Sequence, residues 1–166
     1  MSNDVDLIAS AQCWIDADPH RATQALGQAL LAENDIETIR EHFGSRLSFG
    51  TAGLRGEMGP GPNRMNHATV RRAAFAFAQH LLNEDTHVLE LGIVVGFDAR
   101  HGSREFAVET ARVFGALNIP SYLYDECQPT PVIAHAITHI GAAGGVIVTA
   151  SHNPPKDNGY KVYWGN

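Results

Sequence analysis

Apolar residues recur at helical spacing through the first forty positions, so residues 4–42 are expected to be helical. Pro19 can open a second helix, and Asp35 can cap a third. We therefore expect residues 1–45 to form an N-terminal helical extension that serves packing or an interface and carries no recognisable chemistry. The first apolar stripe consists of Leu7, Ile8, Ala11 and Ile15.

The pattern changes at residues 46–66, "RLSFGTAGLRGEMGPGPNRMN", where five glycines and two prolines exclude a long helix. This composition predicts a shaped loop entered from a short strand. Helical periodicity then returns and predicts a helix over residues 67–82. Its apolar stripe consists of Val70, Ala73, Ala74, Phe77, Ala78 and Leu81.

The remaining chain alternates between strand and helix patterns. Residues 91–96 form an apolar run without alternation, which indicates a strand covered on both faces. Ser103 can cap the following helix, and Pro131 can open the next one. Further strands are expected in "PSYLYD", "GGVIVTA" and "GYKVYW", the last as an alternating edge strand. The pattern predicts an α/β fold for residues 46–166: a three-layer α/β/α domain with a mostly parallel, mixed sheet.

The composition of the chain argues against several classes of function. The chain has 166 residues, 44% of them hydrophobic, and 12 Lys+Arg against 18 Asp+Glu give a net charge of -6. A general role in binding nucleic acid or an anionic membrane is therefore not expected. Two cysteines without CxxC spacing do not indicate a disulfide framework or a metal site. The first residues lack the basic region of a signal peptide, so a soluble, cytoplasmic protein is expected.

Candidate chemistry gathers at the predicted carboxyl ends of two strands, where open α/β sheets bind ligands. The loop "GFDARHGS" follows the first of these strands, and "TASHNPPKDNG" follows the other. Basic and amide side chains on this rim are candidates for binding phosphate, and the glycine-rich segment could reach the same rim. The candidate phosphate-binding residues are Arg55, Arg100, Asn153 and Lys161.

Ser151 is the candidate that could carry covalent chemistry. It does not sit in a GxSxG elbow, so acyl transfer is weakly supported. His152 is its neighbour, and neighbours on an extended chain point opposite ways, which makes His152 a poor base for Ser151. Pro154 and Pro155 stiffen the segment, and a held hydroxyl near cations and amides suits a phosphoryl group. The alternative is an ordinary polar turn.

Arg55, in "GTAGLRGEMG", could bind phosphate in a bidentate fork with nearby backbone amides. The alternative is a surface arginine in a tight turn. Asp98 and Arg100 could instead pair with each other and fix their loop. No P-loop or dinucleotide fingerprint is present, and His135 and His139 lack the glutamate of a zinc-binding HExxH motif.

Three stretches together resemble the first domain of the α-D-phosphohexomutase superfamily, most closely its phosphoglucomutase/phosphomannomutase branch. They are "FGTAGLRGEMGPGPNRMN" (49–66), "GFDARHGS" (96–103) and "VTASHNPPKDNGYKVY" (148–163). The resemblance implies that Ser151 is a phosphoserine that exchanges a phosphoryl group with a sugar phosphate. The phosphoryl group would move between C1 and C6, or C5, through a bisphosphorylated sugar.

The resemblance also implies roles for individual residues. Arg55 is expected to hold the phosphoserine or the transferring phosphate, while Lys161 and His152 assist with proton movement and charge. The phosphate on Ser151 is expected to bind Mg²⁺, with the other metal ligands outside this chain. The partners implied are a hexose or pentose phosphate and a sugar bisphosphate.

Part of the family's site is not found in this sequence. The metal loop, the sugar-recognition loop and the phosphate-binding loop of later domains do not occur in it. We therefore expect the missing C-terminal domains to be partners of this domain, and the chain alone to have little or no mutase activity. A non-catalytic module that binds a phosphosugar or a protein partner is the alternative, and a serine hydrolase is a third reading.

Overall fold

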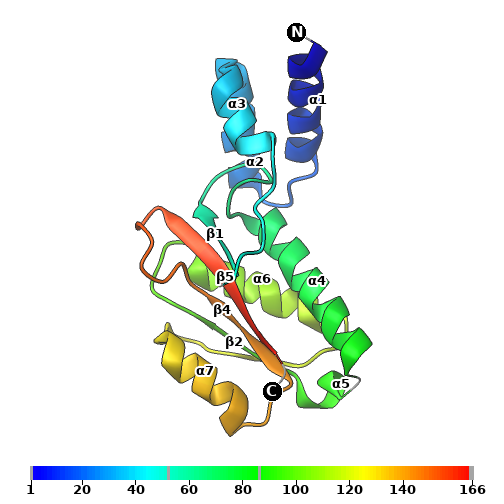
Figure 1. The fold of residues 1–166 in the computed structure, drawn as a ribbon, viewed down its shortest axis with the longest axis vertical. Coiled ribbons are helices and arrows are strands. Elements are labelled where there is room, and N and C mark those ends of the chain that lie inside the picture. The colour runs from blue at the N-terminus through cyan, green and yellow to red at the C-terminus, as the bar shows by residue number, and fades with distance from the viewer. Residues whose placement is uncertain (1, 52, 86, 165–166) are drawn as a thin grey trace.

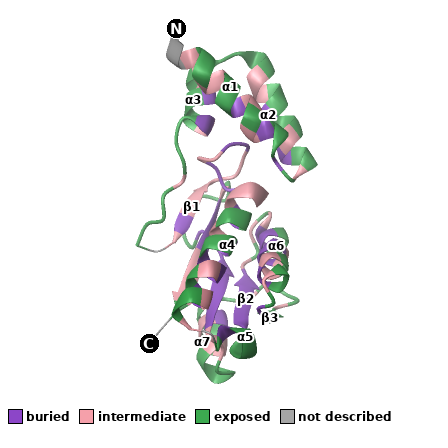
Figure 2. Cartoon of the chain, turned by 90° about the vertical axis from the view of Figure 1, so that its right-hand side faces the viewer, coloured by how far each residue is buried: buried purple, intermediate pink, exposed green. Residues whose placement is uncertain are grey.

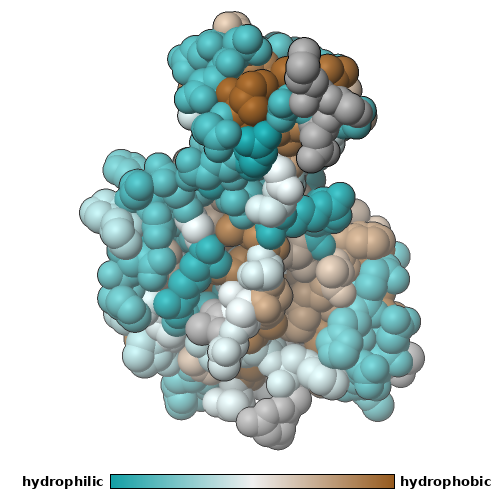
Figure 3. Space-filling model, turned by 45° about the horizontal axis from the view of Figure 1, so that its top comes forward, coloured by the Kyte–Doolittle hydropathy of each residue, from teal (hydrophilic) through white to brown (hydrophobic). Residues whose placement is uncertain are grey.

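The computed structural model describes residues 2–51, 53–85 and 87–164. Three helices form a lobe of their own at one end of the molecule, and Figures 1 and 2 show it standing clear of the sheet. Hydrophobic side chains are exposed on this lobe beside hydrophilic ones (Figure 3), and Leu26 is an example at 59% exposure. The helices are α1 (Ser2–Asp16), α2 (Arg21–Glu33) and α3 (Ile36–Phe43).

The helical lobe has its own small core, in which the predicted stripe residues Ala11 and Ile15 pack against Ile39 and Phe43. Asp35 caps α3 as expected, because its carboxylate accepts hydrogen bonds from the Glu37 and Thr38 amides. Pro19 does not open α2. The helix begins two residues later, with the His20 ring as its N-cap.

The lobe is joined to the rest of the chain by polar and aromatic contacts. Arg64 pairs with Glu41 at 2.5 Å, and the rings of His20 and His67 stack with their centroids 4.2 Å apart. Burial lowers the pKa of His67, and electrostatic interaction with the neighbouring His20 lowers it further. Burial also raises the pKa of the nearby Asp18. The junction is therefore packed and partly desolvated.

One mixed sheet, in the order β1-β5-β4-β2-β3, forms the centre of the α/β domain. Strands β2, β3 and β4 are parallel, whereas β5 runs antiparallel to both β4 and β1. The predicted α/β class with a mixed sheet is confirmed. The strands are β1 (Leu54–Glu57), β2 (Ile93–Phe97), β3 (Ser121–Leu123), β4 (Gly144–Val148) and β5 (Asp157–Trp164).

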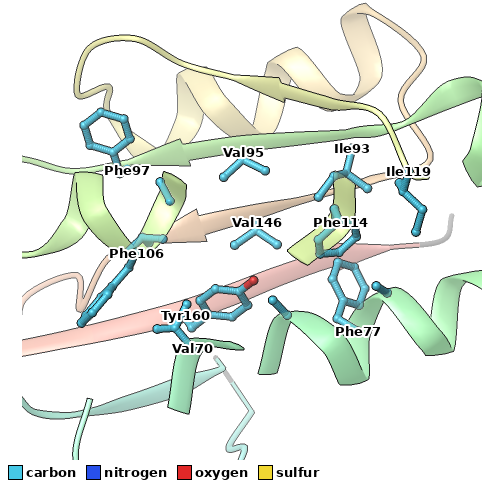
Figure 4. Close-up of a cluster of buried hydrophobic side chains, with 14 of the residues drawn as sticks. Val70, Phe77, Ile93, Val95, Phe97, Phe106, Phe114, Ile119, Val146 and Tyr160 are labelled. Carbon is cyan, nitrogen blue, oxygen red and sulfur yellow. The ribbon is translucent and has the colours of Figure 1, made fainter. Parts of the chain in front are cut away.

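Helices cover the two faces of this sheet unequally. Helices α4 and α6 pack on one face over the main core, where Phe106, Phe114 and Tyr160 meet Val95 and Val146 (Figure 4). Helix α7 covers β2 and β4 on the other face (Figure 1). The helices of this domain are α4 (His67–Glu84), a short α5 (Val88–Leu91) that was not expected, α6 (Ser103–Ala116) and α7 (Thr130–His139).

The prediction that the last strand lies at the sheet edge was wrong. Strand β5 lies between β4 and β1, and β1 is at the edge. Tyr160 and Val162 face the main core, whereas Lys161 lies on the opposite face, where α7 packs mainly on β2 and β4. The alternation of apolar and polar residues in β5 therefore arises because one face of this inner strand packs on the main core, while its other face is partly open.

The glycine-rich segment is also organised differently from the expectation. The short strand lies within it, as β1, so that Arg55 belongs to a strand. Gly53 has φ 97, and a β-carbon there would stand 2.1 Å from the Tyr160 carbonyl oxygen, so only glycine fits. Asn66 closes the segment, because its amide donates to the carbonyls of Gly59 and Gly61 while its oxygen caps α4.

Ser103 was expected to cap α6, but Gly102 holds that position with φ 75. The Ser103 hydroxyl instead donates to Asp98 at 2.7 Å.

Within the described residues, no helix is both long enough and apolar enough to cross a membrane.

Candidate functional site

The serine loop, residues 149–157, connects β4 to β5 at the carboxyl end of β4. The carboxyl end of the parallel strand β2 lies next to it, because Phe97 pairs with Val148. Ser151 is exposed and has φ 59, a left-handed conformation that is uncommon for a residue with a side chain. A structure that holds a serine in this state must supply specific interactions.

Asp98 and Thr149 supply part of the support. Asp98 accepts hydrogen bonds from the hydroxyls of Thr149, at 2.6 Å, and of Ser103. The Thr149 hydroxyl oxygen in turn accepts the backbone N–H of Ser151 at 2.9 Å. A chain of hydrogen bonds therefore runs from the loop after β2 to the backbone of Ser151. Sequence reasoning missed this role of Thr149, for which no local signal exists.

Arg100 supplies the rest of the support. One terminal nitrogen donates to the carbonyls of Pro154 and Asp157, at 2.8 and 3.0 Å. The other donates to the carbonyls of Ser151 and Asn153, both at 2.8 Å. Its Nε lies 3.2 Å from Asp98. The alternative in which Asp98 and Arg100 pair to fix the loop thus describes the geometry, and phosphate binding by Arg100 lacks a free N–H group.

The expectation that Ser151 and His152 point opposite ways was wrong. It assumed an extended chain, whereas the left-handed turn at Ser151 brings the His152 Nδ1 to 3.4 Å from the Ser151 hydroxyl oxygen. This distance is too long for a strong hydrogen bond, but catalytic hydrogen bonds are often long without a ligand. Both side chains are exposed at the loop surface.

Arg55 and Lys161 lie on the same face of the sheet, next to the serine loop. Arg55 is opposite Gly159 in the β1–β5 ladder, two residues from Lys161 along β5. The Thr149 amide, at the start of the serine loop, donates to the Gly159 carbonyl. Arg55, Gly159 and Thr149 therefore form one row across three chain segments.

Neither cation is paired with another described residue. The Arg55 Nε is buried and has no hydrogen-bond partner, and no ion pair or side-chain hydrogen bond is found for Lys161 within the described parts of the chain. Lys156 differs, because it pairs with Glu57 at 2.8 Å. This hydrogen bond lowers the pKa of Glu57 and raises the pKa of Lys156. An unpaired, partly buried arginine, opposite the Gly159 that bonds to the start of the serine loop, is suited to hold an anion.

Two amides tie the surrounding loops together. Asn153, a predicted phosphate-binding residue, donates from its side chain to Asp157 at 2.8 Å and keeps a second N–H. Asn158 is fully buried and donates to the His101 carbonyl and the Ser103 hydroxyl. It links β5 to the loop after β2. Sequence reasoning missed Asn158, whose place in an Asn-Gly pair pointed only to a turn.

The described residues alone do not fit a magnesium site. They contain no group of three or more His, Cys, Asp or Glu that could hold a metal ion. The carboxylates nearest the loop are already engaged: Asp98 by two hydroxyls and Arg100, and Asp157 by Asn153. Hard cations need several oxygen ligands. The chemistry of this chain is therefore that of a serine hydroxyl, an imidazole and two cations.

Comparisons with known proteins identify the family to which the chain belongs. The family model for the phosphoglucomutase/phosphomannomutase alpha/beta/alpha domain I matches residues 46–166. A phosphopentomutase from Homo sapiens is 39% identical over all of the chain, and a phosphoglucomutase from Staphylococcus epidermidis is 38% identical over 90% of it. A crystal structure titled as a phosphomannomutase from Thermus thermophilus covers 72% of the chain, with 34% identity and a TM-score of 0.62.

The chain belongs to the phosphoglucomutase/phosphomannomutase family, and it contains the family's α/β/α domain I. It spans 28% of the length of the human phosphopentomutase, 26% of the Staphylococcus epidermidis phosphoglucomutase and 26% of the Thermus thermophilus chain. The family resemblance stated from the three sequence stretches is confirmed.

Proposed function

We propose that this chain is the phosphoserine domain of a phosphosugar mutase, with Ser151 as the phosphoryl carrier. The enzyme would move a phosphoryl group between C1 and C6 of a hexose phosphate, or C5 of a pentose phosphate. The observation that supports this most directly is an exposed serine, fixed in a left-handed turn, on a loop whose first residue, Thr149, bonds to Gly159 opposite the unpaired Arg55. Membership in the family supports it independently.

The proposed transfer exchanges one P–O bond for another. A sugar hydroxyl oxygen attacks the phosphorus of phosphoserine 151, the bond from Ser151 Oγ to phosphorus breaks, and the sugar becomes a bisphosphate. The hydroxyl proton passes to the His152 imidazole, while the Lys161 ammonium stabilises the charge on the transferring group. In the return step Ser151 Oγ attacks the other phosphoryl group, and the product sugar phosphate leaves. The protonated group returns its proton to the leaving sugar oxygen.

Arg55 has the charge-stabilising role in this proposal. A phosphoserine carries about -1.5 to -2 charges, and the buried Nε of Arg55 is a donor that lacks a partner. A guanidinium next to the transferring group stabilises the charge on its equatorial oxygens. Mg²⁺ is proposed as a cofactor of the longer protein, with ligands from outside this chain in addition to the phosphate on Ser151.

A cytoplasmic location is proposed as well. Cys13 and Cys127 are both exposed free thiols, as is usual in a reducing compartment, where disulfides are rare. A sugar phosphate and a sugar bisphosphate are the proposed small-molecule partners. The choice between hexose and pentose is left to the experiment.

The test is carried out on the natural-length protein, because the relatives are several times longer than this chain. Intact mass and peptide mapping should find one phosphoryl group on Ser151, and assays should find mutase activity with glucose 1-phosphate or ribose 1-phosphate plus the matching bisphosphate. Ser151→Ala should lose both. The 166-residue chain alone should show little or no turnover.

Different outcomes separate the alternatives. A natural-length protein that binds sugar phosphates but never phosphorylates Ser151 or turns over would be a non-catalytic module, and the proposal would be wrong. Stable labelling of Ser151 by a fluorophosphonate, with hydrolysis of an ester substrate, would instead identify a serine hydrolase. Sustained turnover by the 166-residue chain would show that the site is complete without further domains.

A further inference from the structure

Arg100 uses all four N–H groups of its terminal nitrogens on backbone carbonyls of the serine loop, and its Nε forms an ion pair with Asp98. Arginine has five N–H donors in a rigid planar fork. Four of them meet backbone carbonyls of the serine loop, and Nε–H faces the Asp98 carboxylate. The side chain is only 15% exposed. A group that is mostly buried and occupied in this way holds the loop and has no terminal N–H donor left for a substrate phosphate.

The direction of the Ser151 carbonyl determines where the next amide points. In a planar trans peptide the N–H of residue i+1 points opposite to the C=O of residue i. Because the Ser151 carbonyl accepts from Arg100, the His152 N–H is turned away from Arg100. It has no hydrogen-bond partner within the described parts of the chain. A donor without a partner therefore lies next to the Ser151 hydroxyl.

Because of two prolines, only one of the three carbonyls at Ser151, Asn153 and Pro154 is followed by an N–H group. The Asn153 and Pro154 carbonyls also accept from Arg100, and each is followed by a proline, Pro154 or Pro155, which has no N–H group. The hydrogen bonds from Arg100 to these two carbonyls therefore leave no N–H group pointing away from Arg100 without a partner. Among the three acceptors at Ser151, Asn153 and Pro154, only the first leaves an outward donor.

We propose that Arg100 is a positioning residue for phosphoryl transfer: by binding four carbonyls of the serine loop it holds Ser151 in its left-handed turn and aims the His152 amide at the phosphoryl group on Ser151. This inference rests on the proposed function. Asp98 and Thr149 complete the device, because Asp98 holds the guanidinium while Thr149 holds the Ser151 N–H. Arg100 itself touches neither the substrate nor the phosphoryl group.

The first experiment replaces Arg100 in the natural-length protein by methionine and by lysine. Arg100→Met should lower kcat about 100-fold or more with little change in KM, because the sugar is not bound by Arg100. Lysine presents a point charge and cannot reach four carbonyls, so Arg100→Lys should recover only a small part of the loss. Arg21→Met is the matched control, since Arg21 is an exposed arginine on the helical lobe, and its kcat should not change.

A second pair of variants keeps the test informative if Arg100→Met does not fold. Thr149→Val keeps the shape of the side chain but removes the hydroxyl that holds the Ser151 N–H, whereas Thr149→Ser keeps the hydroxyl. Thr149→Val should lower kcat about 10-fold, and Thr149→Ser should restore most of it. The rate at which phosphoserine 151 transfers its group in a single turnover should fall in parallel.

The outcomes distinguish this inference from the proposed function. If the unmodified protein phosphorylates Ser151 and turns over, but Arg100→Met folds and keeps its kcat, the positioning role is wrong and the mutase proposal stands. A rise in KM at unchanged kcat would instead make Arg100 a substrate-binding residue and would also overturn the inference. If the unmodified protein carries no phosphoserine at all, the proposed function fails first.

Discussion

Arg55 lies directly across from Gly159, and its side chain occupies the space that a side chain at position 159 would need. A β-carbon on Gly159 would stand 3.2 Å from the Arg55 Cγ and 2.7 Å from the carbonyl oxygens of Leu54 and Thr149. Gly159 is therefore required by close packing between three segments. This glycine allows Arg55 to lie across the sheet toward the serine loop.

Gly159→Ala should consequently destabilise the domain and displace Arg55. The expected loss is about 1–3 kcal/mol in the free energy of unfolding, as for overpacking of a tight site, measured by urea denaturation. Gly115→Ala is the matched control, because a β-carbon at Gly115 in α6 would meet nothing within 4 Å. Alanine should stabilise that helix by about 0.5–1 kcal/mol. Equal effects of the two changes would contradict the packing argument.

Arg55→Lys should lower kcat/KM of the natural-length protein by about 100- to 1,000-fold, the usual cost of losing one donor to a transition state. Lysine keeps the charge but loses Nε and the fork that binds two phosphate oxygens. Arg46→Lys, at an exposed arginine of the same glycine-rich segment, should leave kcat/KM unchanged. Near-normal activity of Arg55→Lys would show that charge alone is sufficient.

Alkaline pH should unfold the protein partly through Tyr160. Burial raises the pKa of this fully buried tyrosine above its ordinary value of 10.0. Above about pH 10 the unfolded chain loses the Tyr160 proton while the folded chain keeps it. The unfolded state then binds fewer protons, so stability falls as the pH rises, by up to about 1.4 kcal/mol per pH unit from this group.

Tyr160→Phe isolates the contribution of Tyr160. Its free energy of unfolding, measured by urea denaturation between about pH 9 and about pH 11, should fall less steeply than that of the unmodified chain. All other residues are the same in the two proteins, so their contributions cancel in the comparison. Parallel curves for the two proteins would contradict a raised pKa of Tyr160 in the folded chain.

Asp35 offers a prediction for the helical lobe. Its carboxylate accepts the amides of Glu37 and Thr38, and the Thr38 hydrogen bonds lower the pKa of Asp35. Asp35→Ala should lower the stability of α3, whereas Asp35→Asn should change it little because asparagine also caps helices. Amide hydrogen exchange across α3 measures both. Unchanged exchange in Asp35→Ala would show that tertiary packing alone holds the helix.

The sequence was informative wherever local periodicity decides the structure. The stripe through Val70, Phe77 and Leu81 is buried as expected, and the uninterrupted apolar run of β2 is covered on both faces. Periodicity could not reveal which strands are neighbours. The alternation around Lys161 was interpreted as an edge because nothing local indicates that β1, far earlier in the chain, pairs beside it.

The candidate site was predicted in part for the same reason. Ser151, Arg55 and Lys161 were proposed as site residues from the sequence; Ser151 lies on the serine loop, and Arg55 and Lys161 lie on one face of the sheet next to it. The role of Arg100 was ambiguous, because its four acceptors are backbone carbonyls that come together only when the loop closes. The approach of His152 to Ser151 depends on a φ angle that the residue types do not indicate.

The inner position of β5 affects how the chain acquires its structure during synthesis. Strand β1 finds its partner only after β5 has been made, and the contact between Glu57 and Lys156 spans 99 positions. Such distant pairings are closed late and slow folding. A nascent chain that has left the ribosome only as far as β4 therefore leaves unpaired the edges of β1 and β4 that β5 later covers, and at this stage it is most prone to aggregation.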